Sequence, residues 1–135
     1  MAEEIFRMET IDTENTFSEK FFSASAGLAT SNGLSPSKNA ILAMRELGRD
    51  ISSHESSQLD EKMIEKANAV FAMTSDHLGI MQSIYPQFKD KLYMLNADKN
   101  ISDPFGGDIS IYRRCRDEIR KAIQKIIPDL KQILK

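Results

Sequence analysis

The run Ala69-Val70-Phe71-Ala72-Met73 constrains the fold more than any other part of the chain. All of its residues are apolar with no polar alternation, which is typical of a strand covered on both faces in a parallel sheet. A second strand is predicted over Lys91–Leu95, and the apolar spacing from Leu78 to Ile84 predicts a helix between the two. Strands that alternate with helices indicate crossover connections, so we expect a three-layer α/β fold with a central parallel sheet.

Helix-end preferences and apolar spacing predict the other elements. Ser35-Pro36 predicts a helix start, because serine can cap a helix and proline suits its first turn. Gly48 is the expected end of that helix, since glycine readily adopts the backbone conformation that follows a helix. Further expectations are helices over 2–8 and 60–67, an extended segment over 21–27 and a long loop over 96–107.

Two more helices are expected to begin at capping residues. Ser75 or Asp76 is the expected cap of the helix between the two strands, and Asp108 is the expected cap of the last helix. Pro128 is expected to kink or restart the last helix, because proline lacks an N–H and clashes with the preceding turn.

Composition excludes several classes of function. The 135 residues fit one domain over 1–135, and 18 basic against 20 acidic residues argue against a nucleic-acid partner. No stretch approaches the ~20 apolar residues of a membrane span, and no signal sequence is apparent, so a cytoplasmic location without a membrane partner is expected. Cys115 is the one cysteine, and no Cys/His spacing suits zinc, so neither an internal disulfide nor a metal or cofactor is expected.

The segment Asp103-Pro104-Phe105-Gly106-Gly107 carries the candidate chemistry. Ligand sites of parallel sheets lie at the carboxyl ends of the strands, where the loops with Thr74 and Asp103 are expected. Asp103 is the candidate general acid, which would protonate a leaving oxygen or nitrogen and then activate water. The alternative is an ordinary turn aspartate before a proline. Pro104 and Phe105 are candidate substrate-binding residues, with loop anchoring as the alternative role of Phe105, and the glycines are expected to allow a tight turn.

An ordered set of short motifs resembles the low molecular weight protein tyrosine phosphatases across the whole chain. The most specific motif is Asp103-Pro104-Phe105-Gly106-Gly107, whose form is most similar to the bacterial branch that includes protein-arginine phosphatases. The other matching landmarks are Ser25-Ala26-Gly27, Ser53-His54, Gln58-Leu59, Ala72-Met73-Thr74, Tyr112 and Arg116-Asp117-Glu118-Ile119.

This resemblance implies a four-stranded parallel sheet in the order 2-1-3-4, flanked by helices. It implies a phosphorylated protein as substrate and hydrolysis of phosphotyrosine or phosphoarginine through a cysteinyl-phosphate intermediate. Asp103 would then be the general acid, Phe105 with Pro104 would contact the substrate, and His54 would be a structural residue that braces the phosphate loop.

The sequence departs from the family at its start. The family's nucleophile lies in a Cys-x5-Arg-Ser loop that leads into Pro-Met-Ala-Glu, and Met1-Ala2-Glu3 matches the last three of those residues. Neither the loop nor the first strand of the family is in the sequence. We therefore expect an N-terminally truncated domain, in which Met1 is an internal methionine mistaken for the initiator, and no activity of the chain as given. The alternative is a natural pseudophosphatase that acts as a protein-interaction module.

Two further expectations follow from these departures. The lone Cys115 is expected to be a packing thiol, and it argues against an arsenate reductase, whose chemistry relays through several thiols. In the family the missing strand lies between the segment near Phe21 and the strand of Val70, and its loss would leave these neighbours about 9–10 Å apart. We expect compensation either by a strand-sharing homodimer or by direct pairing of the Phe21 segment with Ala69–Met73.

Overall fold

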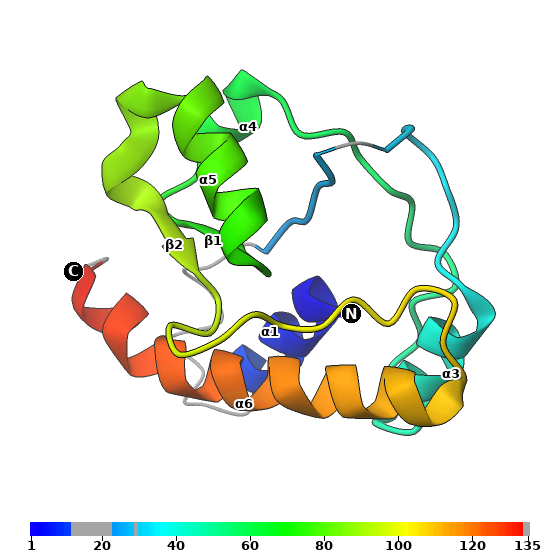
Figure 1. Ribbon diagram of the computed structural model, residues 1–135. Helices are drawn as coiled ribbons and strands as arrows, with labels where there is room; N and C mark the ends of the chain where they lie inside the picture. The colour runs from blue at the N-terminus through cyan, green and yellow to red at the C-terminus, as the bar shows by residue number, and fades with distance from the viewer. Residues whose placement is uncertain (12–22, 29, 134–135) are drawn as a thin grey trace.

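The computed structural model describes residues 1–11, 23–28 and 30–133 and confirms the α/β class (Figure 1). A small parallel sheet is accompanied by helices, and the longest of these, α6, runs along one side of the molecule. The helices and strands, in chain order, are α1 (Ala2–Ile11), α3 (Lys38–Arg45), α4 (Glu61–Lys66), β1 (Val70–Ala72), α5 (Ser75–Ile84), the 3-10 helix η1 (Pro86–Lys91), β2 (Leu92–Met94) and α6 (Ile109–Ile133).

The two strands are those expected from the apolar runs. β1 and β2 pair in parallel, with Val70 opposite Leu92 and Ala72 opposite Met94, and α5 with η1 forms the crossover between them. The pairing continues past β2, where the Leu95 N–H donates to the Ala72 carbonyl at 2.8 Å. Within the described residues the sheet has these two strands.

The prediction of an extended strand over 21–27 is wrong for the part of this segment that the structure describes. Residues 21 and 22 lie outside the described residues, and 23–26 form no strand. Gly27 makes a single parallel bridge with Gln58, in which the Gly27 N–H donates to the Ser57 carbonyl and the Gly27 carbonyl accepts from the Leu59 N–H, both at 2.8 Å. One bridge to an irregular segment does not propagate a ladder, so no strand forms there. The strand-sharing homodimer stays a prediction.

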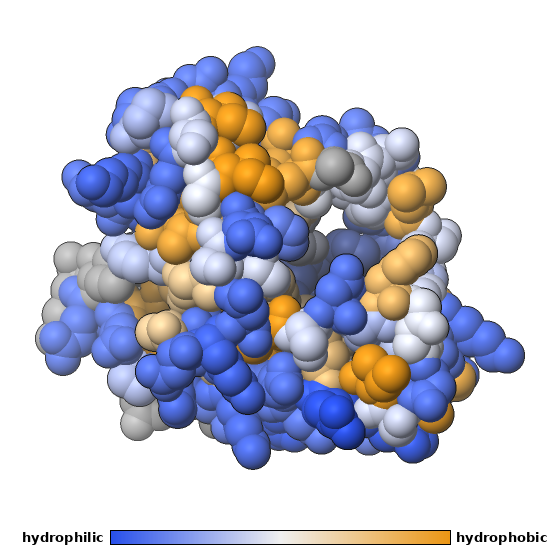
Figure 2. Space-filling view, viewed as in Figure 1, coloured by the Kyte–Doolittle hydropathy of each residue, from blue (hydrophilic) through white to orange (hydrophobic). Residues whose placement is uncertain are grey.

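The buried side chains form two clusters on different sides of the molecule. α1 and α3 both pack on α6 and enclose the larger cluster, whereas α5 packs on β1 and β2 and encloses the smaller one. Figure 2 shows a hollow between these two parts. The larger cluster contains Ile5, Ala40, Ala43, Met44, Ile51, Leu95, Ile101, Tyr112, Cys115, Ile119, Ala122, Ile123 and Ile127, and the smaller one Ile64, Ala72, Met81 and Leu92.

Two helix caps differ from the expected residues. α3 begins at Lys38, where Ser37 Oγ accepts the Ala40 N–H at 3.2 Å, so a start at Ser35-Pro36 is wrong. Thr74, and not Ser75 or Asp76, caps α5 by accepting the His77 N–H at 3.1 Å. All these residue types can cap, and the one that stands in extended backbone beside the first helical turn takes the role. Asp108 is confirmed as the cap of α6, since its Oδ1 accepts the Ile111 N–H at 3.1 Å.

Helix bounds also differ from expectation at three points. α3 ends at Arg45, and Gly48, the expected end, follows in a turn with a φ of 75°. α1 continues beyond Met8 to Ile11, with the Thr10 hydroxyl donating to the Phe6 carbonyl at 2.9 Å. α6 continues through Pro128 to Ile133, so the helix does not restart at the proline. The proline is exposed and lies near the end of the helix, where water can satisfy the one carbonyl that loses its donor.

Candidate active site

The segment 103–107, called the acid loop below, folds into a tight turn before α6. Asp103 Oδ1 accepts the Phe105 N–H at 3.0 Å, and the Gly107 N–H donates to the Pro104 carbonyl at 2.8 Å. Gly106 has a φ of 78°, which favours glycine, and a Cβ on Gly107 would lie 2.9 Å from both the Pro104 carbonyl oxygen and the Ile111 side chain. Both glycines therefore serve the turn, as the sequence predicts.

Three elements hold the acid loop and the residues just before it. The Ile101 N–H donates to the Met73 carbonyl at 2.8 Å, which ties the loop to the end of β1. Cys115 Sγ on α6 donates to the Ser102 carbonyl at 3.4 Å. Asn39 Nδ2 on α3 donates to the Gly107 carbonyl at 3.1 Å. The loop is thus fixed at both ends, with Asp103 between the two attachments.

The side chains of the acid loop face solvent. Asp103 is exposed, Phe105 is 86% exposed, and Pro104 is half-buried. A ring that exposed does not anchor the loop, which leaves it free to contact another molecule. The loop therefore presents one carboxyl group and one aromatic ring on a common turn.

His54 lies beside the start of α1. Its Nδ1 is 3.6 Å from Glu3 Oε2, and Ser25 Oγ donates to Glu3 Oε1 at 3.1 Å. Beside this group, Arg49 Nε donates to Glu4 Oε1 at 2.8 Å. These contacts tie the segments around residues 25 and 49–54 to the first turn of α1. The nearest charged partner of His54 is therefore Glu3, and its expected structural role stays a prediction.

Cys115 is hydrogen-bonded to the residue just before the acid loop and lies within reach of the charge of the Met1 amino group. Met1 packs against the larger buried cluster, to which Cys115 and Ile101 belong. Burial raises the pKa of the Cys115 thiol to about 11, with smaller effects of the same sign from the charges of Glu118 and Asp103 and an opposing effect from the Met1 amino group. A thiol with that pKa is protonated at neutral pH and is not a nucleophile there.

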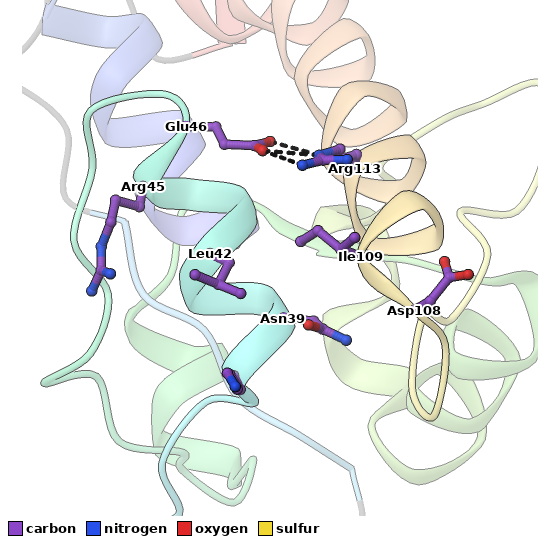
Figure 3. A pocket seen from close by; sticks show the side chains of 8 residues that line it. Asn39, Leu42, Arg45, Glu46, Asp108, Ile109 and Arg113 are labelled. Carbon is purple, nitrogen blue, oxygen red and sulfur yellow. Dashed lines mark hydrogen bonds and ion pairs between the residues drawn. The ribbon is translucent and has the colours of Figure 1, made fainter.

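A groove between α3 and α6 lies beyond the acid loop (Figure 3). Its wall residues leave out Asp103, Phe105 and His54, so it is distinct from the residues expected to do chemistry. Asn39 is its connection to the loop, through Gly107. The residues that line it are Lys38, Asn39, Leu42, Arg45, Glu46, Asp108, Ile109 and Arg113.

Two other kinds of site are absent from the described residues. No group of three or more His, Cys, Asp or Glu side chains in residues 1–11, 23–28 and 30–133 could hold a metal ion. None of the helices in that part of the chain combines the length and apolar character that crossing a membrane requires.

The fold and the acid loop together define a phosphatase-like α/β domain, and comparison with known proteins gives its family. Residues 1–135 match the low molecular weight phosphotyrosine protein phosphatases, and the chain belongs to this family. The family resemblance inferred from the motifs is confirmed, including its bacterial arginine-phosphatase-like branch.

Similar proteins include two named as arginine phosphatases and one named as an arsenate reductase. A protein-arginine-phosphatase of Geobacillus stearothermophilus is 37% identical over 111 residues, which cover 78% of this chain and 74% of the relative. The solved structure of an arginine phosphatase from the same organism has a TM-score of 0.85 at 31% identity, covering 97% of this chain and 83% of that one. An arsenate reductase of Staphylococcus aureus (strain Newman) is 36% identical over 100 residues, which cover 74% of this chain and 70% of the relative.

Sequence reasoning missed two residues of this region. In the sequence Glu3 is only part of the Met1-Ala2-Glu3 match, although its carboxylate lies 3.6 Å from His54 Nδ1 and accepts a hydrogen bond from Ser25 Oγ. Asn39 carried no signal, because its partner Gly107 is 68 residues away in the chain. The acidic pair at a helix start could have drawn attention to Glu3, whereas only the tertiary structure brings Asn39 to the loop.

Proposed function

We propose that this domain supplies the general acid of a phosphatase that hydrolyses phosphoarginine in proteins. The observation that carries the proposal is the acid loop with its exposed Asp103. Cys115 donates to the Ser102 carbonyl just before this loop, and it lies close enough to both Asp103 and the Met1 amino group for their charges to shift its pKa. The N-terminal end of a helix favours a bound anion, so a phosphoryl group there would lie on the side of Asp103. The name of the Geobacillus relative favours phosphoarginine over phosphotyrosine as the substrate.

The proposed reaction has two steps. A cysteine thiolate attacks phosphorus and forms an S–P bond while the P–N bond to arginine breaks, and protonated Asp103 gives its proton to the leaving nitrogen. Asp103, now a carboxylate, takes a proton from a water molecule whose oxygen attacks phosphorus. The S–P bond breaks, inorganic phosphate leaves, and the thiolate is restored. With phosphotyrosine the leaving atom would be oxygen and the proton balance the same.

The thiolate must come from residues other than these 135. Cys115 is buried and has a pKa of about 11, and the sequence holds no Cys-x5-Arg loop. We propose that the chain as given does not turn over phosphate esters, and that activity needs a strand and such a loop joined ahead of α1. The loop arginine would bind two phosphate oxygens in a fork.

A fusion protein tests this proposal. The strand and cysteine loop of the Geobacillus relative are joined to Met1, and hydrolysis of p-nitrophenyl phosphate and of a phosphoarginine protein is measured. We expect no turnover by the 135-residue chain and phosphate-inhibited turnover by the fusion. Asp103→Asn in the fusion should lower kcat by about 10²–10⁴, the usual share of a general acid.

Asp98→Asn is the matched control, because Asp98 is an exposed aspartate of the same long loop. Turnover by the chain alone that survives Cys115→Ser would overturn the need for a further thiol. A fusion that is equally active with Asp103→Asn would remove Asp103 from the acid role. A higher kcat/KM for phosphotyrosine than for phosphoarginine proteins would overturn the substrate assignment.

A second candidate function is a pseudophosphatase that binds phosphorylated protein without cleaving it. Cys115, the one thiol of the sequence, has a raised pKa and is not reactive at neutral pH, which favours the pseudophosphatase. Upstream DNA separates the two: an in-frame Cys-x5-Arg run before Met1 supports the phosphatase, and a ribosome-binding signal at Met1 without such a run supports the pseudoenzyme. Light scattering on the purified chain tests the strand-sharing homodimer, which predicts twice the monomer mass.

A further inference from the structure

We propose that Asn39 is a positioning residue for Asp103, acting through the carbonyl of Gly107. Its effect on catalysis rests on the proposed function, whereas its effect on the acid loop does not. The proposal follows from where the loop is attached, what fixes Asn39, and what proton transfer requires.

The half of the acid loop that follows Asp103 has few external attachments. The hydrogen bonds of Phe105 N–H and Gly107 N–H both end on atoms within the loop. Phe105 and Gly106 are exposed. Across the part of the chain that the structure describes, the bond from Asn39 Nδ2 to the Gly107 carbonyl is the first one that leaves the loop after Asp103. A carbonyl only accepts, so the atom of Asn39 that faces it must be the amide nitrogen.

Asn39 itself stands on a fixed helix. α3 buries Ala40, Ala43 and Met44 in the larger cluster. At its other end, Arg116 Nη1 on α6 donates to the Ala43 carbonyl at 2.9 Å. Figure 3 shows Asn39 pointing from α3 toward the start of α6, where the acid loop ends. The donor is therefore held in place by packing and by the contact of α3 with α6, independently of the loop.

The loop has little freedom to replace this bond. Gly107 is half-buried, and the space at its Cβ position is filled by the Pro104 carbonyl and the Ile111 side chain. Among the described residues Asn39 is the one hydrogen-bond partner of the Gly107 carbonyl, so without this donor we expect the loop to pivot about its attachment at Ser102. A general acid must come within ~2.6–3.2 Å of the atom that it protonates, so such a pivot would move Asp103 out of reach.

The first experiment uses the 135-residue chain and needs no activity. Amide hydrogen exchange of Phe105 and Gly107 is followed by NMR in wild type, Asn39→Asp and Lys38→Ala. Asn39→Asp keeps the side-chain shape, removes the donor, and suits the first turn of a helix. We expect about tenfold faster exchange of both amides in Asn39→Asp and wild-type rates in Lys38→Ala, since Lys38 is the exposed neighbour on the same helix. Equal rates in all three proteins would overturn the proposal.

The second experiment uses the active fusion and compares leaving groups. Leaving-group protonation belongs to the first step, which kcat/KM reports, and it matters most for a poor leaving group. Asn39→Asp should therefore lower kcat/KM at least about tenfold more for phenyl phosphate than for 2,4-dinitrophenyl phosphate. Asn39→Gln, which keeps the NH₂ donor, should recover part of the loss. An equal loss with both substrates would indicate general damage and overturn the positioning role. An inactive wild-type fusion would count against the proposed function only, because the exchange rates still decide the role of Asn39.

Discussion

The guanidinium of Arg113 binds the carboxylate of Glu46 in a fork, with Nε 3.0 Å from Oε1 and Nη2 2.6 Å from Oε2 (Figure 3). Arg116 adds a bond from Nη1 to Glu46 Oε1 at 2.6 Å. The Glu46 carboxylate at the end of α3 thus binds two arginines of α6. These bonds hold α3, and Asn39 on it, against the helix that follows the acid loop.

The first prediction concerns the pH dependence of this contact. Hydrogen bonds from Arg113 and Arg116 lower the pKa of Glu46 from 4.5 to about 2. A lowered carboxyl pKa contributes stability above the unfolded pKa, and this contribution is lost as the pH falls through the folded pKa. The urea midpoint of wild type should therefore exceed that of Glu46→Gln at pH 7, and the difference should shrink between about pH 4.5 and pH 2.

Salt and a second glutamate provide the controls for Glu46. The contact is at the surface, so 1 M NaCl should reduce the difference at pH 7. Glu65→Gln changes an exposed glutamate of α4 and should leave the midpoint near the wild-type value at both pH values. A difference between wild type and Glu46→Gln that stays constant down to pH 2 would show that the lost charge is not its source.

The second prediction distinguishes Thr74 from Ser75 as the cap of α5. Thr74→Ala removes the oxygen that accepts the His77 N–H and should destabilise the domain by about 1 kcal/mol. Ser75→Ala should change the free energy of unfolding by less than about 0.5 kcal/mol, because this serine is the first helical residue and not the cap. Chemical unfolding of both variants measures the two values, and the reverse order would assign the cap to Ser75.

The third prediction contrasts two glycines. Gly79 lies within α5, is exposed, and has no atom near a built Cβ, so Gly79→Ala should stabilise the domain by roughly 0.5–1 kcal/mol. Gly107→Ala places a Cβ 2.9 Å from the Pro104 carbonyl oxygen, so the acid loop must shift. Thermal unfolding should show a higher Tm for the first variant and a lower Tm for the second. A stabilising Gly107→Ala would mean that the turn can open without cost.

The fourth prediction concerns the reactivity of Cys115. Burial is the largest cause of its pKa of about 11, against 9.0 for an ordinary thiol, so the thiolate fraction at pH 8 falls about 100-fold. Alkylation by iodoacetamide at pH 8 should be at least that much slower in the folded chain than in urea. Mass spectrometry over time measures both rates. Equal rates would place the thiol at the surface and reopen its role as a nucleophile.

The sequence identified the strands and the acid loop because local signals carry them. An unbroken apolar run as short as that around Val70 favours a buried strand over other structures. Asp103 with the two glycines that follow it favours a tight turn through local contacts alone. The helix starts were less certain because neighbouring residues compete for the cap. Ser35 and Ser37 both qualify by type, and packing of Ala40 and Met44 on α6 decides where α3 begins.

Contacts between distant residues were beyond the reach of the sequence. The segment around Gly27 pairs at one bridge with Gln58, where a strand was expected, and no local pattern reports which neighbour a polar, small-residue segment will find. The same holds for Glu3 with His54, whose partnership exists only because α1 returns beside residues 49–54.

The sequence by itself determined the class of fold, the family and the residue expected to act as general acid, because apolar periodicity and a compact motif are local properties. The tertiary structure alone decided what holds that residue in place. Asn39 and Cys115 reach the two ends of the acid loop from separate helices. Such contacts depend on how the helices pack, and packing is a property of the whole chain.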